Sequence, residues 1–253
     1  MADPQTYDCL QGQQPYQFRM EWTHKQTEHL HNLQNALDRD ASDEELYGLL
    51  DKIMEHYEVY HEAKEDAARH DILQVMYPMW QSLLESVFSW IGGWRPTTIL
   101  RLVNSQASEL QGAQPQLASH GWESAGQFCE QSAAIHALQR KTEREEDQLS
   151  QQFSVLQQTI TAEPVLVQAL KLQLPERPGH TEEFYKQLEA AFEVRLKELE
   201  ILYLGAERLR QVSFKTLINI LNPVQAARYL ISVAQYEFAM KKIGDNKIRM
   251  FRT

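Results

Sequence analysis

The sequence predicts an all-α protein, in which long amphipathic helices pack antiparallel as a bundle in a single domain without a sheet. Apolar residues recur at helical spacing along nearly the whole chain of 253 residues. Glycine and proline are scarce, with 10 and 9 residues, and they cluster where helices are expected to end. No stretch shows the long alternation of apolar and polar residues that marks a half-buried strand. We expect the helical domain to cover residues 15–243.

The N-terminal part of the chain predicts two helices behind a polar arm. The arm, residues 1–14, is polar, and we expect it to be flexible. The first helix covers residues 15–38. The second helix begins after Ser42, because Ser42 and Glu45 have the spacing of a capping box, and it continues towards Leu73.

The middle of the sequence predicts a helix, a tight corner and the start of another helix. Ser82 and Glu85 have the spacing of a second capping box. The pair Gly92-Gly93 can take the positive φ that stops a helix, so we expect the helix after Ser82 to end at this pair. Pro96 suits the first turn of the short helix that follows, where a missing N–H costs nothing.

Aromatic residues surround this corner. Trp90 and Trp94 flank the glycine pair, and Arg95 follows directly. We expect the tryptophan rings to fill the core, and Arg95 to pair with a carboxylate such as that of Glu85 or to cap free carbonyls. The alternative is that the corner binds a partner protein, because Trp and Arg are enriched at the centres of protein interfaces.

The remaining predicted elements are one short helix and three long ones, with two surface connections and one sharp break between them. The helices cover residues 96–103, 126–161, 181–221 and 224–242, and the last of them ends at Gly244. The connections cover residues 105–126 and 162–180, the break is Asn222-Pro223, and residues 244–253 form a basic tail.

Charge and cysteine content exclude several classes of function. The chain has 25 Lys and Arg against 35 Asp and Glu, a formal net charge of −10, which disfavours direct binding to nucleic acid. Cys9 and Cys129 alone cannot build a disulfide framework or a thiolate zinc site. No apolar run approaches the ~18 residues of a membrane helix. We therefore expect a soluble, intracellular protein that contacts neither nucleic acid nor membrane directly.

Residues that could carry chemistry are few. The sequence lacks the nucleophile elbow, the phosphate loop, the zinc-protease motif and the dinucleotide fingerprint, so we predict no enzyme and no catalytic residue. His56 and His61 lie in the densest polar and aromatic cluster. They are five positions apart, about 140° around a helix, so they do not share one face and we predict no metal site. We expect both histidines to stay near the surface.

Three stretches resemble the plant Delay of Germination domain family, whose domain also forms the C-terminal half of TGA-type bZIP transcription factors. Residues 18–22 (FRMEW) resemble the opening Trp helix, and residues 80–96 resemble the pattern W-x-S-P-L-E…W-x-G-G-x-R-P-S. Residues 209–227 resemble the block L-R…T-L…I-L…P-x-Q-A-A. The residues that carry these motifs, which we expect to be structural, are Trp22, Trp80, Ser82, Glu85, Trp90, Gly92, Gly93, Trp94, Arg95, Pro96, Pro223 and Gln225.

The resemblance implies a non-enzymatic regulator that acts by binding other proteins. In the dormancy branch of the family these partners include protein phosphatases of abscisic-acid signalling; in the transcription branch they are bZIP factors and co-regulators. The resemblance also implies a possible homodimer and a location in the nucleus and cytoplasm. No basic region or leucine zipper precedes Trp22, so the chain resembles a bZIP-free member, which would reach DNA only through a bZIP partner.

Two departures from the family pattern bear on ligands. Leu83 stands where the family often has Pro, but Ser82 and Glu85 still supply the cap. Some dormancy-type members carry a histidine pair in the last helix that is linked to haem; the aligned positions here are Glu237 and Lys241, neither a usual iron ligand. We therefore predict no cofactor. Haem bound through His56 or His61, or a lipid-like molecule held between the helices, stays as the alternative.

Overall fold

The helices of a computed structural model confirm the predicted fold class. The structure describes residues 14–78, 81–103, 125–162 and 182–250. In these stretches no strand forms, and Trp90 and Gly93 make only an isolated bridge. The helices are α1 (Gln14–Asp38), α2 (Asp43–His70), α3 (Ile72–Met76), α4 (Leu83–Val87), α6 (Ala125–Ala162), α8 (Glu182–Ile220) and α9 (Pro223–Met250), with a further helical segment over residues 96–103.

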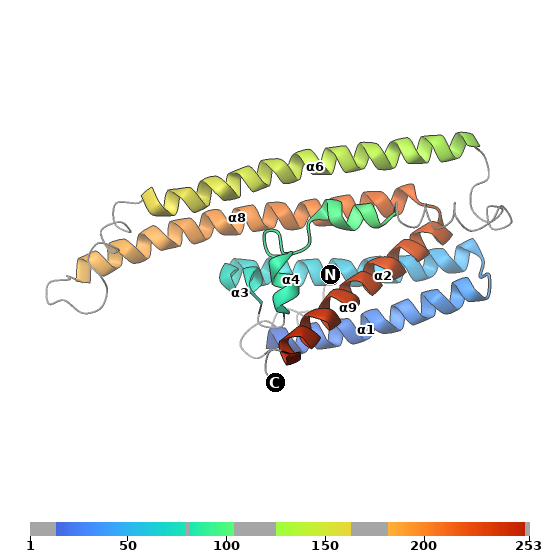
Figure 1. Cartoon of the computed structure of the whole chain (residues 1–253), viewed down its shortest axis with the longest axis horizontal. Coiled ribbons are helices and arrows are strands. Elements are labelled where there is room, and N and C mark those ends of the chain that lie inside the picture. Colours follow the sequence, from blue (N-terminus) through green and yellow to red (C-terminus); the bar gives the residue numbers. More distant parts are fainter. Residues whose placement is uncertain (1–13, 79–80, 104–124, 163–181, 251–253) are drawn as a thin grey trace.

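Long antiparallel pairs build the bundle. Helices α6 and α8 lie side by side in opposite directions along one side of the molecule, and α1 and α2 form a second antiparallel pair (Figure 1). Helix α9 crosses this second pair and also packs against α4, and α8 packs against α2. The corner that follows α4 lies between the two pairs, where it can contact both.

Two hydrophobic clusters fill the interior. The larger one joins α1, α2, α8, α9 and residues 96–103 around fully buried side chains such as Leu33, Leu217 and Tyr229. The smaller one joins the end of α2, α3, the corner and α8 around Tyr203 and Ile91. Burial of such apolar faces, rather than local helix propensity, supplies most of the stability of long helices.

Polar side chains fix several helix ends. Ser82 Oγ accepts the Glu85 N–H at 3.2 Å while Glu85 Oε2 accepts the Ser82 N–H at 2.8 Å, which confirms the predicted capping box. Ser42 caps α2, as predicted, but the carboxylate of Glu45 contacts Arg39 instead of reaching back, so this box is incomplete. The Glu45 carboxylate therefore contacts the Arg39 side chain, outside the helix, in place of the Ser42 backbone N–H.

The second predicted helix is interrupted. It was expected to continue towards Leu73, but α2 ends at His70 because Asp71 has an extended conformation, with φ −152° and ψ 97°. The Asp71 side chain accepts the Leu73 N–H at 3.0 Å and thereby starts α3. A short acidic side chain that bonds to nearby backbone competes with helix continuation.

The helix after Ser82 was predicted to run to the glycine pair, and this is wrong. Helix α4 ends at Val87, and Phe88, which follows it, is 57% exposed. The Trp90 N–H instead donates to the Gly93 carbonyl at 2.7 Å. Contacts of the corner with distant helices, described below, draw this backbone out of a helical path.

The last helix is longer than predicted. Helix α9 begins at Pro223, directly after the predicted break, but it passes through Gly244 and ends at Met250. A Cβ at Gly244 would lie 2.6 Å from Ser82 Cβ, so the missing side chain lets α9 approach the start of α4 closely. Glycine serves here for packing rather than as a helix stop.

Several predictions fall on residues that the structure does not describe. They are most of the arm over residues 1–14, Trp80, nearly all of the connections over residues 105–126 and 162–180, and the end of the tail after Met250. The domain limits and the flexibility of the arm therefore stay predictions.

Candidate functional site

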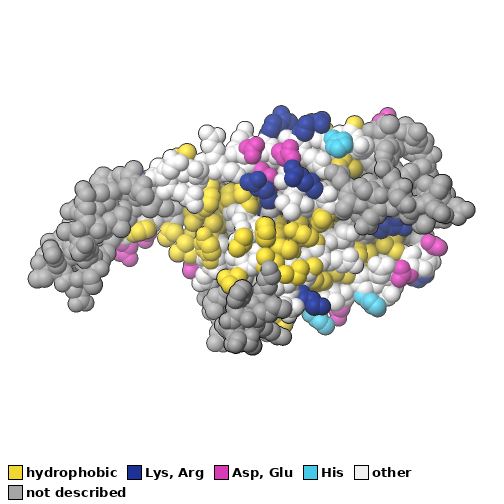
Figure 2. Space-filling view, viewed as in Figure 1, with side chains coloured by type: hydrophobic (Ala, Val, Ile, Leu, Met, Phe, Trp, Pro, Cys, Tyr) yellow, Lys and Arg dark blue, Asp and Glu magenta, His cyan; other side chains and the backbone are white. Residues whose placement is uncertain are grey.

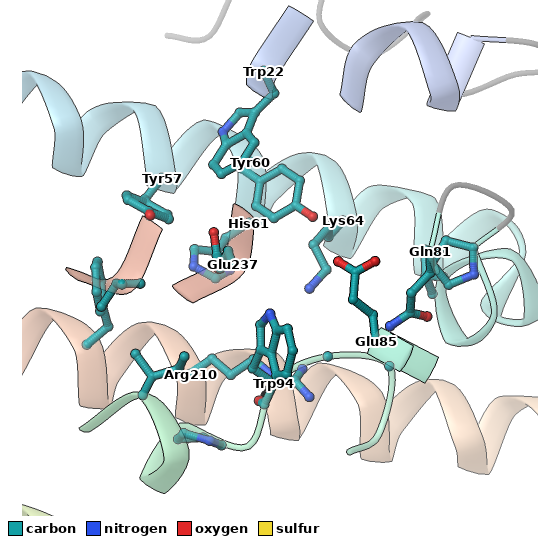
Figure 3. Close-up of a pocket in the computed structure, with 18 of the residues that line it drawn as sticks. Trp22, Tyr57, Tyr60, His61, Lys64, Gln81, Glu85, Trp94, Arg210 and Glu237 are labelled. Carbon is teal, nitrogen blue, oxygen red and sulfur yellow. Dashed lines mark hydrogen bonds between the residues drawn. The ribbon is translucent and has the colours of Figure 1, made fainter. Parts of the chain in front are cut away.

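A cavity of about 170 Å³ lies between the Gly92-Gly93 corner and helices α1, α2, α8 and α9. Figure 3 shows the side chains that point into it from these elements. Its apolar wall combines aliphatic side chains with five aromatic rings, which are those of Trp22, Tyr57, Tyr60, Trp94 and Phe214.

Charged side chains face the same cavity. Arg19, Lys64 and Arg210 contribute positive charge, and Glu85 and Glu237 contribute carboxyl groups. Burial raises the pKa of Glu237, against the lowering effect of Arg19 and Lys64. The lining of the cavity is therefore not purely apolar, because it combines aromatic rings with several ionisable groups.

A buried carboxylate organises one side of the cavity. Glu207 on α8 is completely buried and accepts hydrogen bonds from Lys64 at 3.0 and 2.9 Å, from Arg210 at 2.7 Å, and contacts His61 Nδ1. Burial alone would raise the pKa of Glu207, but Lys64, Arg210 and His61 hold it well below its usual range. In return, Glu207 raises the pKa of Lys64 against the effect of burial. This group joins α2 to α8.

Arg210 connects that carboxylate to the corner. Its guanidinium donates to the carbonyl of Trp94 at 2.9 Å, to that of Ile91 at 2.9 Å, and to that of Trp90. Ile91 has φ 44° and Gly92 has φ 71°, so two successive residues adopt left-handed conformations. Such a conformation is unfavourable for a β-branched residue, and it persists where surrounding contacts hold it. Arg210 supplies these contacts.

Hydrogen bonds to α6 hold the other side of the corner. Trp90 Nε1 donates to Ser150 Oγ at 2.9 Å, and the backbone N–H and hydroxyl of Thr97 donate to the buried Glu146 carboxylate at 2.7 and 2.8 Å. Arg95 was predicted to pair with a carboxylate such as Glu85 or to cap carbonyls. Arg95 pairs with the carboxylate of Glu146, with its Nε 3.8 Å from Glu146 Oε2. Glu85 accepts from the Ser82 N–H in the capping box, and the carbonyls of the corner accept from Arg210.

Aromatic stacking joins α1 to α2 beside the cavity. Trp22 stacks on His56 and on Tyr60, with ring centroids 5.1 and 4.5 Å apart. His56 was expected near the surface, but it is only 9% exposed, and its Nε2 lies 3.2 Å from the Trp22 carbonyl oxygen. Burial lowers the pKa of His56 to about 4. A histidine next to tyrosines on an apolar helix face was therefore a core residue.

The remaining motif residues lie at helix junctions. Pro96 is buried at the start of the helical segment over residues 96–103. Pro223 is buried at the start of α9. Gln225 exchanges two hydrogen bonds with Asn222, at 2.9 and 3.0 Å, and bonds to Gln131 of α6 at 2.8 Å. Each of these positions sets the path of the chain between helices.

Several cavity residues were not predicted as site residues. Arg19, Lys64 and Arg210 line the cavity from three different helices, so no local pattern groups them. Glu207 lies behind this lining, bonded to Lys64 and Arg210. One signal was available: Glu207 lies four positions after Tyr203, on the apolar stripe of its helix. A charged residue at a core position points to a buried ion pair.

The geometry also bears on metal and haem. In the described residues, no three His, Cys, Asp or Glu side chains are close enough to hold a metal ion. His56 uses Nε2 at the Trp22 carbonyl, and His61 uses Nδ1 at Glu207. A cavity of about 170 Å³ is small beside the ~300–1,000 Å³ of pockets for drug-sized ligands, so it does not fit a haem as it stands. We predict no cofactor, and haem bound through either histidine stays the alternative.

The chain is similar to known plant proteins. A family model described as seed dormancy control matches residues 29–105. Transcription factor TGA2.3 of Oryza sativa subsp. japonica is 30% identical over 224 residues, which is 88% of this chain and 61% of that protein. Transcription factor TGA7 of Arabidopsis thaliana is 30% identical over 231 residues, 90% of this chain and 55% of that protein.

Only part of each relative matches this chain, and this limits which of their properties can be assigned to it. Since the chain spans about three fifths of TGA2.3 and just over half of TGA7, the activity of those whole proteins is not transferred by the match. Within the described helices, none is both long and apolar enough to cross a bilayer. The chain is therefore similar to the seed dormancy control family over residues 29–105, and to TGA-type transcription factors of plants along most of its length.

Proposed function

We propose that this chain is a plant transcription regulator that acts in the nucleus by binding other proteins. The observation that carries the proposal is the similarity to TGA-type transcription factors over 88% of the chain. The net charge of −10 supports an indirect route to DNA, through a bZIP partner or a co-regulator. Protein phosphatases and a second copy of the chain are the other partners that the resemblance suggests, and a cytoplasmic role would accompany the phosphatase branch.

Exposed apolar side chains on the short helices offer a surface for such a partner. Leu83 and Val87 on α4 are 71% and 77% exposed, and Phe88 follows them at 57%. Hydrophobic side chains gather near the centre of the face in Figure 2, the region where Figure 1 places α4. Clusters of exposed apolar groups of this kind are typical of protein interaction sites.

The test is binding between the purified chain and defined partners. We expect the full chain to bind a TGA-type bZIP factor such as TGA7, and to shift a DNA probe only when that factor is present. The variant Val87→Asp should weaken binding at least tenfold, whereas Val155→Asp, at a 53% exposed position on α6, should not. Binding to a protein phosphatase but to no bZIP factor would favour the dormancy branch. A DNA shift by the chain alone would contradict the proposal.

A ligand-binding sensor is the second candidate function, and the aromatic cavity, which is too small for a haem as it stands, favours a small apolar ligand. A Soret absorption band in protein purified from plant tissue would support haem, and a co-purifying apolar molecule found by mass spectrometry would support a lipid-like ligand. The absence of both would leave protein binding as the function of this domain.

A further inference from the structure

One basic side chain of the cavity differs from the others. The Arg19 guanidinium lies over the ring of Trp22, 4.7 Å from its centroid, and near that of Tyr60, at 5.3 Å. Its Nε is buried and has no hydrogen-bond acceptor, and no described carboxylate forms an ion pair with it. A buried donor without an acceptor is unfavourable, so a group that accepts from Arg19 would be bound strongly.

The other two basic groups are already engaged. Arg210 donates to Glu207 and to the carbonyls of the corner, and Lys64 donates to both oxygens of Glu207. Neither guanidinium nor ammonium is therefore free to serve as the main anchor of an anion. Arg19 is the basic group of the cavity wall that keeps its hydrogen-bonding capacity.

The carboxyl groups of the wall do not satisfy Arg19. Glu85 uses Oε2 to cap α4 through the Ser82 N–H. Glu237 makes no hydrogen bond with a described residue; burial raises its pKa and the charge of Arg19 lowers it. Its carboxyl group therefore leaves the Arg19 Nε–H without an acceptor.

The size and lining of the cavity define the rest of the ligand. Its volume is about 170 Å³. An engineered apolar cavity of about 150 Å³ holds one benzene molecule. Ring faces of Tyr57, Phe214 and Trp94 line the remaining wall, so they would contact an apolar or aromatic body of about one ring.

We propose that this cavity binds a compact organic acid, with its carboxylate on the Arg19 guanidinium and a body of one ring or a short chain against the aromatic wall. An Arg fork recognises a carboxylate through two parallel hydrogen bonds, which sets the orientation of the ligand. The site is independent of the protein-binding function proposed above, because it depends on the cavity and not on the surface of α4.

The experiment measures the binding of four probes that differ in charge and shape to the full chain. Isothermal titration with benzoate, benzyl alcohol, hexadecanoate and inorganic phosphate separates charge from shape. We expect benzoate to bind at least tenfold more tightly than benzyl alcohol or phosphate, and to quench tryptophan fluorescence because Trp22 and Trp94 line the cavity. Equal binding of benzoate and benzyl alcohol, or no binding of benzoate, would overturn the proposal. Tighter binding of hexadecanoate would overturn the compact size.

Variants assign the anchor. Arg19→Met should weaken benzoate binding at least tenfold while leaving the weak binding of benzyl alcohol unchanged. Arg208→Met makes the same substitution at an exposed position of α8 and should bind benzoate like the parent. If Arg19→Met fails to fold, Arg19→Lys keeps the charge but loses the fork and should still bind benzoate more weakly. Unchanged benzoate affinity in the folded Arg19 variant would remove Arg19 from the site.

Discussion

Substitution of Gly92 by Ala tests whether the corner is held in a strained, closely packed form. Gly92 has φ 71°, and a Cβ built on it would lie 2.5 Å from Tyr203 Cε2 and 2.9 Å from Tyr203 Cδ2. The left-handed conformation costs about 1 kcal/mol for alanine, and overpacking against a buried ring typically costs about 1–3 kcal/mol more. Tyr203 is completely buried, so its ring has little room to move.

We therefore expect Gly92→Ala to lower the free energy of unfolding by about 2–4 kcal/mol, which is ~4–16 °C in Tm for a domain of this size. Differential scanning calorimetry measures this change. The control is Gly48→Ala on α2, where a Cβ would meet nothing within 4 Å. That substitution should stabilise the protein by about 0.5–1 kcal/mol, because alanine favours a helix. A Tm of Gly92→Ala equal to that of the parent would refute the reasoning.

Three other substitutions test the groups around the cavity. Glu207→Gln removes the carboxylate that, in the described part of the chain, bonds both Lys64 and Arg210, and it should cost about 3–5 kcal/mol in urea unfolding. The control Glu58→Gln, at a surface pair, should cost under ~1 kcal/mol, and similar costs would contradict the role of Glu207. His56 has a folded-state pKa of about 4, below its ordinary value, so stability should fall as the pH drops through the range from ~6.5 to 4. The part due to His56, about 2 kcal/mol between pH 7 and 5, should be missing in His56→Gln, and an identical pH profile would argue against it. Trp90→Ala should cost about 3 kcal/mol, near the low end for a large aromatic side chain because the ring is half-buried, and an unchanged thermal melt would exclude a packing role.

Local patterns allowed good prediction of the helices. The Ser82 and Glu85 pair is a contact between near neighbours, so spacing alone was enough to identify it. The end of α4 could not be identified in this way. It depends on Arg210, which lies 120 positions away along the chain and bonds the Trp90 carbonyl. Gly244 shows the same limit, because a glycine that permits close packing and a glycine that stops a helix look alike in sequence.

The cavity could not be predicted from local sequence patterns for the same reason. His61 and Glu207 are 146 positions apart, and their contact exists only once α2 packs against α8. Hydrophobic periodicity gives the buried face of each helix but not which helix it meets. Several motif residues line the cavity, among them Trp22, Glu85, Gly92, Gly93 and Trp94, although the sequence indicated a structural role for them and no cavity. The charged residues between them became visible only in three dimensions.

The hydrogen bonds made by α6 have a consequence for how the two longest helices align. Apolar stripes on a long antiparallel pair would allow several alignments, displaced by about one heptad, at similar energy. Thr142 of α6 meets Ser213 of α8 at 3.1 Å inside the interface, and Glu146, Ser150 and Gln131 bond to points on the corner and on α9. A shifted alignment would leave these buried and part-buried polar groups without their present partners. They therefore specify a single register for α6 against α8.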